Sequence, residues 1–248
     1  LTPINRMGAL TKLFSTKKLI FNRNHYGVII VDNGQADAMI SGLTRNYSDT
    51  IRPALQIIGI QPDVKRAAGM YILFTKRGPF FFADATMNIN PTADELVDIT
   101  VLTAAAVQKF NITPRIALLS YSNFGSSKGV VPDKVQSAVA KLHRDHSELI
   151  VDGDIQANFA LNNELLKEQF PFSDLVDKNV NTLIFPDLAS GNIAYQLMKQ
   201  MAEIETLGPI VLGLNKPEHI LQQRSTVTES INIIPYAVSV AKWKRGEQ

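Results

Sequence analysis

The sequence contains no cysteine. This absence excludes disulfides, zinc sites built on thiolates and a cysteine nucleophile. Charge is also scarce, because charged residues make up 19% of the chain and Lys and Arg exceed Asp and Glu by only 25 − 23 = 2. Such a balance gives no strong field to attract nucleic acid or an anionic membrane. We therefore expect neither as a partner. Because cysteine is absent, any chemistry must be carried by hydroxyl, carboxylate, imidazole or cationic groups.

Long apolar runs are missing as well. No run approaches the roughly 20 residues that cross a bilayer, and the N-terminus lacks the charged and then apolar layout of a signal peptide. We expect a cytoplasmic protein. The chain starts at Leu1 with a short polar lead-in, which suggests a piece of something longer, and the meaning of residues 1–25 stays open.

Several motifs for cofactors and nucleophiles are absent. The glycine fingerprints for dinucleotides, the phosphate-binding loop and the GxSxG nucleophile pattern do not occur. His143 and His146 are three residues apart and could face one metal ion, but a solvated helix face is the favoured interpretation. Arg144 beside them would repel a cation, so we expect no metal site in this chain.

The sequence does contain short apolar runs separated by helical patterns. Several runs are continuously apolar, as in strands that helices cover on both faces of a mostly parallel sheet. This pattern predicts a layered α/β fold. The expected strands cover residues 28–31, 38–41, 70–74, 80–83, 116–119, 149–151, 182–185 and 210–213.

Helices are expected between these strands. Thr92 and Glu95 fit a capping box, and an apolar face follows at helical spacing up to Phe110. A second such stripe extends from Val131 to Leu142, and a third helix is expected over residues 188–205. We interpret the stripes as core packing.

Polar and cationic groups follow four of the expected strands, within residues 40–56, 119–127, 151–158 and 185–195. In open α/β sheets, ligands bind outside the carboxyl ends of strands, where helix N-termini present free N–H groups to anions. In the first segment Ser48 or Asp49 could cap a helix, and Pro53 is tolerable only near its first turn. Arg52 would then lie near the helix start. It suits either a phosphate or a surface ion pair with Asp49, and we weigh the two evenly.

The order of short motifs along the chain is more specific than any one of them. They are Arg-Pro-Ala-Leu-Gln at 52–56, Phe-Ala-Asp at 82–84, Leu-Ser-Tyr-Ser at 119–122, Asp-Gly-Asp-Ile-Gln at 152–156, Ile-Phe-Pro-Asp-Leu at 184–188, Gly-Asn-Ile-Ala-Tyr at 191–195, Gly-Pro-Ile at 208–210 and Gly-Leu-Asn-Lys-Pro at 213–217. From about Tyr26 to the C-terminus, this series resembles the landmarks of phosphotransacetylases, which move an acetyl group between CoA and phosphate.

The resemblance implies a two-lobe, three-layer α/β/α fold like that of isocitrate and isopropylmalate dehydrogenases. It implies a first lobe of residues 1–60 plus 211–248, a second lobe of residues 61–210, and a ligand cleft between them. The implied ligand-binding residues are Arg52, Ser122, Asn123, Asp187, Asn192 and Lys216.

The catalytic positions of the family match this sequence poorly. The resemblance puts the family's serine and an arginine on Gln222 and Gln223, its base aspartate on Glu229 and a second arginine on Gln200. A shift of one residue would credit Arg224 with the missing arginine. We therefore name no catalytic residue.

These replacements resemble the phosphotransacetylase-like C-terminal domains of bacterial NADP-dependent malic enzymes. That resemblance implies a regulatory and oligomerising domain that binds acetyl-CoA or another acyl-CoA as effector without transacetylase activity. It also implies a homodimer through the helix over residues 188–201, within a higher oligomer. NADP and a divalent metal, Mg or Mn, are expected only in an N-terminal malic-enzyme part outside this chain. The alternatives are a free-standing phosphate acetyl- or butyryltransferase and a structural module that binds no ligand of consequence.

Overall fold

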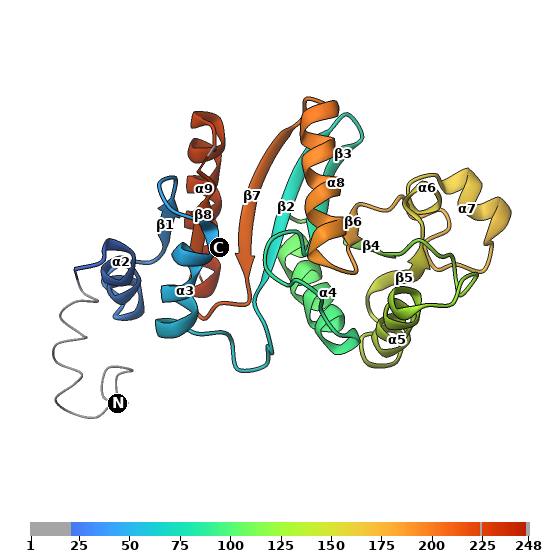
Figure 1. Cartoon of the computed structure of the whole chain (residues 1–248), viewed down its shortest axis with the longest axis horizontal. Coiled ribbons are helices and arrows are strands. Elements are labelled where there is room, and N and C mark those ends of the chain that lie inside the picture. Colours follow the sequence, from blue (N-terminus) through green and yellow to red (C-terminus); the bar gives the residue numbers. More distant parts are fainter. Residues whose placement is uncertain (1–20, 224, 247–248) are drawn as a thin grey trace. The chain divides into compact units, whose positions relative to one another are not determined.

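The computed structural model describes residues 21–223 and 225–246. The chain forms two compact units, which are considered separately here: unit 1 comprises Leu1–Asp63 with Leu214–Gln248, and unit 2 comprises Val64–Gly213 (Figure 1). The ligand cleft that the resemblance implies between two lobes stays a prediction.

Unit 2 is built on a six-stranded mixed sheet. Its strands, in sheet order, are β5 (Ile150–Ile155), β4 (Arg115–Leu119), β6 (Thr182–Ile184), β3 (Gly78–Ala83), β2 (Ala68–Thr75) and β7 (Glu205–Leu212). The first four are mutually parallel, and β2 is antiparallel to both β3 and β7. Because β3, β6, β4 and β5 are parallel neighbours, their carboxyl ends meet at one edge of the sheet, which we call the carboxyl edge.

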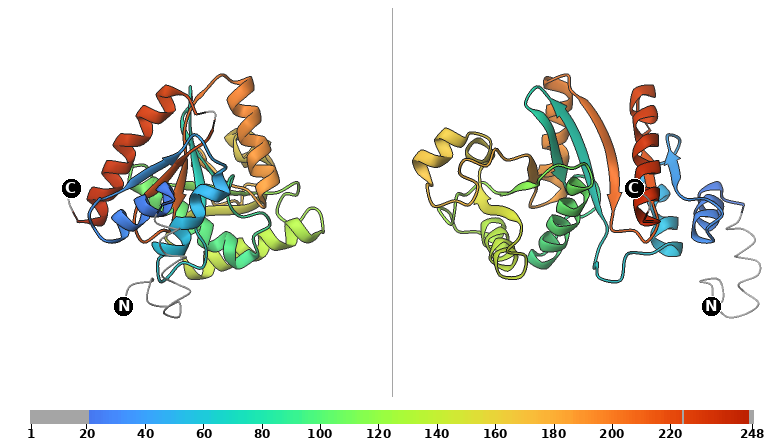
Figure 2. Two further views of the ribbon diagram at one scale, coloured as in Figure 1. Left: turned by 60° about the vertical axis from the view of Figure 1, so that its left-hand side comes forward. Right: turned by 180° about the vertical axis from the view of Figure 1, so that it is seen from behind.

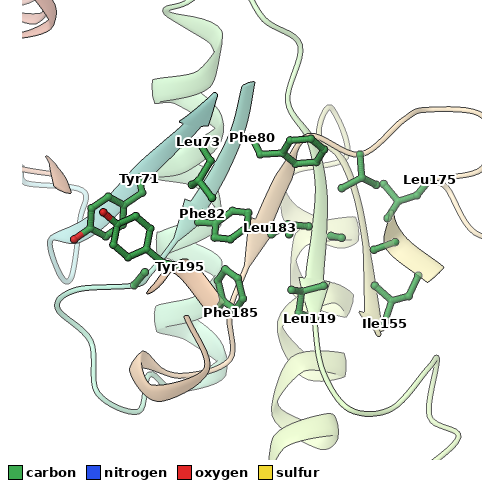
Figure 3. Close-up of a cluster of buried hydrophobic side chains, with 14 of the residues drawn as sticks. Tyr71, Leu73, Phe80, Phe82, Leu119, Ile155, Leu175, Leu183, Phe185 and Tyr195 are labelled. Atoms are coloured by element: carbon green, nitrogen blue, oxygen red, sulfur yellow. The ribbon is translucent and has the colours of Figure 1, made fainter. Parts of the chain in front are cut away.

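Helices cover both faces of this sheet, as the layered pattern predicts (Figures 1 and 2). The pleat of β3 divides its side chains between the two faces. Phe81 points toward Phe110, which follows α4 (Ala93–Gln108), with ring centroids 6.0 Å apart. Phe80 and Phe82 belong instead to the cluster on the side of α8 (Leu188–Met201), where the rings of Tyr71 and Tyr195 stack with their centroids 3.7 Å apart (Figure 3). The helices of unit 2 are α4 (Ala93–Gln108), α5 (Val130–Asp145), α6 (Ala157–Ala160), α7 (Asn163–Gln169) and α8 (Leu188–Met201).

The capping box expected at Thr92 is confirmed. The Thr92 hydroxyl accepts the Glu95 N–H, and the Glu95 carboxylate accepts the Thr92 N–H. The apolar stripe of α4 is buried at Leu96 and Ile99, and that of α5 at Val135 and Leu142. These two helices therefore form where local sequence and core packing agree.

Unit 1 has a smaller sheet, in which β1 (Met39–Gly42) pairs in parallel with β8 (Glu218–Leu221). Its described helices are α2 (Arg23–Asp32), α3 (Tyr47–Ile57) and α9 (Val227–Lys244). Thr226 and Glu229 form a second capping box at the start of α9.

The strand expected over residues 28–31 is wrong, because these residues lie in α2. A run of four apolar residues does not distinguish a strand from a helix by itself. The buried residues of α2 are Asn24, Val28 and Val31, whose spacing is helical. Polar Asn24 at the start of this face concealed the pattern.

The helix start expected at Ser48 or Asp49 is also wrong. The N-cap of α3 is Asn46, and Pro53 lies inside the helix as its seventh residue. Proline there removes one backbone N–H from the helix, which costs stability. Pro53 is buried, so packing of this face offsets that cost.

One strand was not expected, and several element limits differ from those expected. Strand β8 was not expected, because polar Glu218 and His219 begin it. Helix α8 ends at Met201 instead of residue 205, and β7 begins at Glu205 instead of residue 210. The polar residues of β8 are buried by tertiary packing, which the local composition does not predict.

Candidate functional site

The turns at the carboxyl edge of unit 2 form the candidate site. They follow β3, β6, β4 and β5, the strands whose ends meet in the parallel part of the sheet. This is the place where open α/β sheets bind ligands. Four of the six ligand-binding residues expected from the sequence, Ser122, Asn123, Asp187 and Asn192, lie in these turns or in the helix that follows.

The turn after β3 is held by the buried carboxylate of Asp84. Its oxygens accept the backbone N–H groups of Thr86 at 2.8 Å, Met87 at 3.1 Å and Asn88 at 3.0 Å. Burial raises the pKa of Asp84, whereas these hydrogen bonds lower it. Asp84 thus fixes the shape of the turn and is committed to the backbone.

Helix α8 begins tightly against this turn. A Cβ atom on Gly191 would lie 2.6 Å from the Asp84 carbonyl oxygen, so only glycine fits without a shift of the backbone. The side-chain amide of Asn192 donates to the Ala85 carbonyl at 3.4 Å. Asp187 caps the helix, because its carboxylate accepts the Ser190 N–H at 2.8 Å. A carboxylate thus already occupies the N-terminus of α8, where an anionic ligand would otherwise bind.

Ser122 and Asn123 hold the loop after β4 in shape. The Ser122 hydroxyl is buried and accepts the Ser127 N–H at 3.1 Å. The side-chain oxygen of Asn123 accepts the Gln156 N–H at 2.9 Å, which ties this loop to the one after β5. Direct contact of these side chains with a ligand stays a prediction.

Asp154 supports the same loop from β5. Its backbone carbonyl accepts the Phe124 N–H at 2.7 Å, and its carboxylate accepts the Gly125 N–H at 3.0 Å. The second carboxylate oxygen is buried, and no described residue hydrogen-bonds to it. The sequence places Asp154 in one of the four polar segments, but nothing in its spacing marks it as the residue on which the neighbouring loop rests.

Sequence reasoning missed a cation at this edge, Lys134 of α5. Its ammonium group donates to the Pro186 carbonyl at 2.8 Å and to the Asn90 side-chain carbonyl at 2.9 Å. Partial burial lowers the pKa of Lys134, and the nearby Asp187 and Glu95 oppose that shift. The only sequence signal is a lysine within the stripe of α5, between buried Pro132 and Val135.

The two expected ligand residues of unit 1 have local partners. The Lys216 ammonium donates to the carbonyls of Val31 at 2.8 Å and Asp32 at 2.7 Å, and so closes the C-terminus of α2. Arg52 lies on the exposed surface of α3, with its guanidinium 3.7 Å from the Asp49 carboxylate. The surface pair weighed in the sequence is therefore present, and a phosphate contact of Arg52 stays a prediction.

The four residues at the positions of the family's catalytic residues, as the resemblance puts them, are exposed or make local contacts. Gln200 is exposed on α8 of unit 2. In unit 1, the Gln222 N–H donates to the Ser225 hydroxyl, and the Gln223 amide lies 3.5 Å from the Asn46 side-chain oxygen. Glu229 completes the capping box of α9. Arg224, the possible substitute arginine, lies outside the described residues.

Across residues 21–223 and 225–246, no three His, Cys, Asp or Glu side chains gather as a metal site requires. His143 Nε2 lies 2.8 Å from the Val151 carbonyl oxygen, and His146 follows the end of α5. No helix in the same part of the chain is long and apolar enough to cross a membrane. A cytoplasmic location stays a prediction.

Known proteins resemble this chain over most of its length. The family model described as phosphate acetyl/butaryl transferase matches residues 6–238. A phosphate acetyltransferase from Clostridium acetobutylicum is 34% identical over 93% of this chain and 71% of its own length. An NADP-dependent malic enzyme from Haemophilus influenzae is 37% identical over 84% of this chain, but only 28% of its own length is covered.

A solved structure agrees with these relatives. The phosphotransacetylase from Streptococcus pyogenes is 35% identical and superposes with a TM-score of 0.85, over 95% of this chain and 71% of its own chain. This chain thus spans from under a third to somewhat over two thirds of the length of these relatives. The fold, the polar carboxyl edge and the extent of these matches agree, and the chain belongs to the phosphate acetyl/butaryl transferase family.

Proposed function

We propose that this chain acts in the transfer of an acyl group between CoA and phosphate. The observation that carries this proposal is the family match over residues 6–238, together with 34% identity to a phosphate acetyltransferase that the chain covers for 71% of its length. The carboxyl edge of unit 2 supports it, because fixed loops there hold amides, hydroxyls and a lysine around the ends of four strands.

The reaction makes specific demands on such a site. A phosphate oxygen attacks the thioester carbon, the C–O bond forms, the C–S bond breaks, and CoA leaves as a thiolate that takes up a proton. The charge that develops on the carbonyl oxygen and on phosphate requires preorganised donors and cations. In unit 2, Lys134 supplies a cation and Asn192 an amide. In unit 1, the exposed guanidinium of Arg52 suits a phosphate.

A second candidate is an acyl-CoA-binding regulatory domain of an NADP-dependent malic enzyme. Two observations favour it beyond the Haemophilus influenzae relative. Glu229, where the resemblance puts the family's base, is engaged in capping α9. Gln200, where the resemblance puts an arginine, carries no charge. NADP and a divalent metal would then bind in a part of the protein outside this chain, and acetyl-CoA would act as effector.

An acyl-transfer assay with a separate binding measurement distinguishes the two candidates. The purified chain is mixed with acetyl-CoA, and CoA release is followed with and without phosphate or arsenate. The proposal expects phosphate-dependent release that Arg52→Gln reduces. Binding of acetyl-CoA by calorimetry without turnover would reject the transferase and favour the regulatory domain.

A gain-of-function variant sharpens that choice. The triple change Gln222→Ser, Gln223→Arg and Gln200→Arg restores the residue types that the resemblance implies, while Glu229 remains to cap α9. A rise in turnover from a near-inactive parent would support the regulatory candidate, since it would show that these positions had lost activity. An active parent that the triple change impairs would support the transferase.

Self-association belongs to the same proposal. Ile193, Leu197 and Met201 recur every four residues on α8 and are 58%, 53% and 79% exposed in the single chain. This spacing places them on one helix face, which suits a homodimer interface. Light scattering that detects only monomer across micromolar concentrations would contradict it.

A further inference from the structure

Lys134 stands where three neighbouring strands of unit 2 end. It lies in α5, the helix that follows β4. Its ammonium nitrogen is 2.9 Å from the side-chain oxygen of Asn90, in the turn after β3, and 2.8 Å from the carbonyl oxygen of Pro186, in the turn after β6. The amine is therefore fixed at the carboxyl edge, one residue from Asp187, while the side chain remains partly exposed.

The two hydrogen bonds of Lys134 also orient the nitrogen. A neutral amine has two N–H bonds and one lone pair, whereas the ammonium form has three N–H bonds and no lone pair. The oxygens of Asn90 and Pro186 accept two N–H bonds, so deprotonation leaves the lone pair outside these two contacts. Partial burial lowers the pKa of Lys134 and so increases the neutral fraction, against the opposing charges of Asp187 and Glu95.

We propose that Lys134 is a self-acylation site, which takes the acyl group from an acyl-CoA or acyl phosphate bound at the carboxyl edge. This inference rests on the proposed function, because that function brings an activated acyl group to this edge. The neutral amine attacks the acyl carbon and a C–N bond forms. The C–S bond of the thioester, or the C–O bond of the acyl phosphate, breaks. CoA or phosphate leaves, and the proton lost from nitrogen goes to the leaving group or to water.

Acylation would change the contacts of this edge. The resulting amide keeps one N–H of the two that Lys134 donates to Asn90 and Pro186, and it loses the positive charge near Asp187. The tie between α5 and the turn before α8 would be weakened. Accumulated acyl donor would thereby loosen the loop that carries Asp187, which makes the modification a form of feedback on the site.

Lys109 is the matched control. Burial also lowers its pKa, so it shares the chemical tendency to react. It is the C-cap of α4, whose first turn lies near the carboxyl edge. Sixteen residues of helix put it about 24 Å along the axis from that end. Reaction governed by pKa alone would label both lysines, whereas reaction with a bound donor would label Lys134.

The test incubates the whole chain with acetyl-CoA carrying a deuterated acetyl group, and separately with acetyl phosphate, and measures the acetylation rate of each lysine by peptide mass spectrometry. We expect Lys134 to react at least about tenfold faster than Lys109, because a bound donor raises the local concentration of the acyl group. Non-acylated CoA should slow labelling of Lys134 by acetyl-CoA and leave Lys109 unchanged. Lys134→Arg and Lys109→Arg confirm the assignment of each labelled peptide.

Equal rates at the two lysines, or no protection of Lys134 by CoA, would overturn the inference. A separate calorimetric measurement of acetyl-CoA binding keeps the two proposals apart. Binding without preferential labelling rejects only the modification. If acetyl-CoA does not bind, the proposed function fails. Acetyl phosphate then tests the inference by itself. Faster labelling of Lys134 than of Lys109 supports the inference, and equal rates reject it.

Discussion

The two units hold their polar residues in different ways. In unit 2, the buried carboxylates of Asp84 and Asp154 accept backbone N–H groups from the turns at the carboxyl edge. In unit 1, Glu218 and His219 are buried in β8, where one Glu218 oxygen and both ring nitrogens of His219 have no hydrogen-bond partner among the described residues. Unit 2 therefore uses buried carboxyl groups to shape loops, although one oxygen of Asp154 also lacks a partner in the described part of the chain, whereas the buried polar residues of β8 in unit 1 hold no described loop in shape.

This difference distinguishes residues that fix the backbone from a residue that is expected only to bind ligand. The candidate residues of unit 2 are set in turns whose backbone they fix, so substitutions there are expected to change folding and ligand binding together. Of the two candidate cations of unit 1, Lys216 closes the C-terminus of α2, whereas Arg52 lies on an exposed helix surface. Its loss is expected to change binding alone. Four sets of substitutions test this contrast.

The largest expected effect is that of Gly191→Ala in unit 2, compared with Gly27→Ala in unit 1. Gly191→Ala forces a Cβ to within 2.6 Å of the Asp84 carbonyl oxygen, so we expect a loss of about 2–3 kcal/mol in the free energy of unfolding. At Gly27 of α2 the added Cβ meets only the flexible end of Met39. Gly27→Ala should thus change stability by less than about 1 kcal/mol, since alanine favours the helix. Urea unfolding of both variants makes the comparison, and equal losses would contradict the rigid seating of α8.

The next effect depends on pH and belongs to unit 1. Burial raises the pKa of Glu218 to about 8, above its ordinary value of 4.5. Between these values the unfolded chain loses the proton and the folded chain keeps it, so the stability that Glu218 contributes is full below pH 4.5 and is lost as the pH rises toward 8. Burial lowers the pKa of His219 to about 4 from 6.5. The stability that His219 contributes therefore rises as the pH increases toward 6.5 and is constant above it. The window from pH 6.5 to 8 therefore isolates Glu218.

Glu218→Gln should remove this dependence, because the amide keeps an acceptor for the Ser41 hydroxyl and cannot ionise. We expect its stability relative to the parent to rise by roughly 1–2 kcal/mol between pH 6.5 and 8, in line with about 1.4 kcal/mol for each pH unit. Denaturant unfolding at both pH values measures it. Glu205→Gln, at an exposed position, is the control, and a parallel rise in that variant would reject the explanation.

A smaller effect separates the two uses of Asp187. Asp187→Ala removes the cap of α8 and should cost about 1 kcal/mol, whereas Asp187→Asn keeps an oxygen for the Ser190 N–H and should be nearly neutral. If the carboxylate also contacts a ligand, the asparagine variant will bind acetyl-CoA more weakly at unchanged stability. Unchanged binding would assign Asp187 to the helix cap only. Thermal unfolding and calorimetry provide the two readouts.

The smallest effect on stability is expected for Arg52→Ala. Its ion pair with Asp49 is exposed and contributes about 0–1 kcal/mol. A lost contact to phosphate would weaken acetyl-CoA binding by about tenfold or more, since a charged hydrogen bond contributes roughly 1.5–3 kcal/mol. Arg144→Ala, which removes an equally exposed arginine paired with Asp145, is the control and should leave binding unchanged. A drop in melting temperature matching any loss of binding would instead give Arg52 a structural role.

The sequence predicted the parts of the fold where local and tertiary preferences coincide. The capping box at Thr92, the stripes of α4 and α5 and the continuously apolar strands of unit 2 are examples. It failed where tertiary packing overrides the local pattern. Residues 28–31 are helical, Pro53 is buried within α3, and Glu218 and His219 form a strand.

The candidate site divides along the same line. Ordered motifs located the turns after the strands, because strand ends and turn residues are adjacent in sequence. They did not reveal that Lys134 reaches Asn90 and Pro186, which are 44 and 52 residues away along the chain. They also left undecided whether Arg52 pairs with Asp49, which depends on helix geometry.

By itself, therefore, the sequence determined the layered α/β class, the family landmarks and the absence of cysteine chemistry, since these depend on residue type and order. Only the tertiary structure decided what each polar side chain does. Asp84 and Asp154 became supports for loops, Lys216 closed α2, and Lys134 came to the carboxyl edge. The physical reason is that a buried polar group must find its hydrogen-bond partners wherever the folded chain brings them, and those partners are mostly distant in sequence.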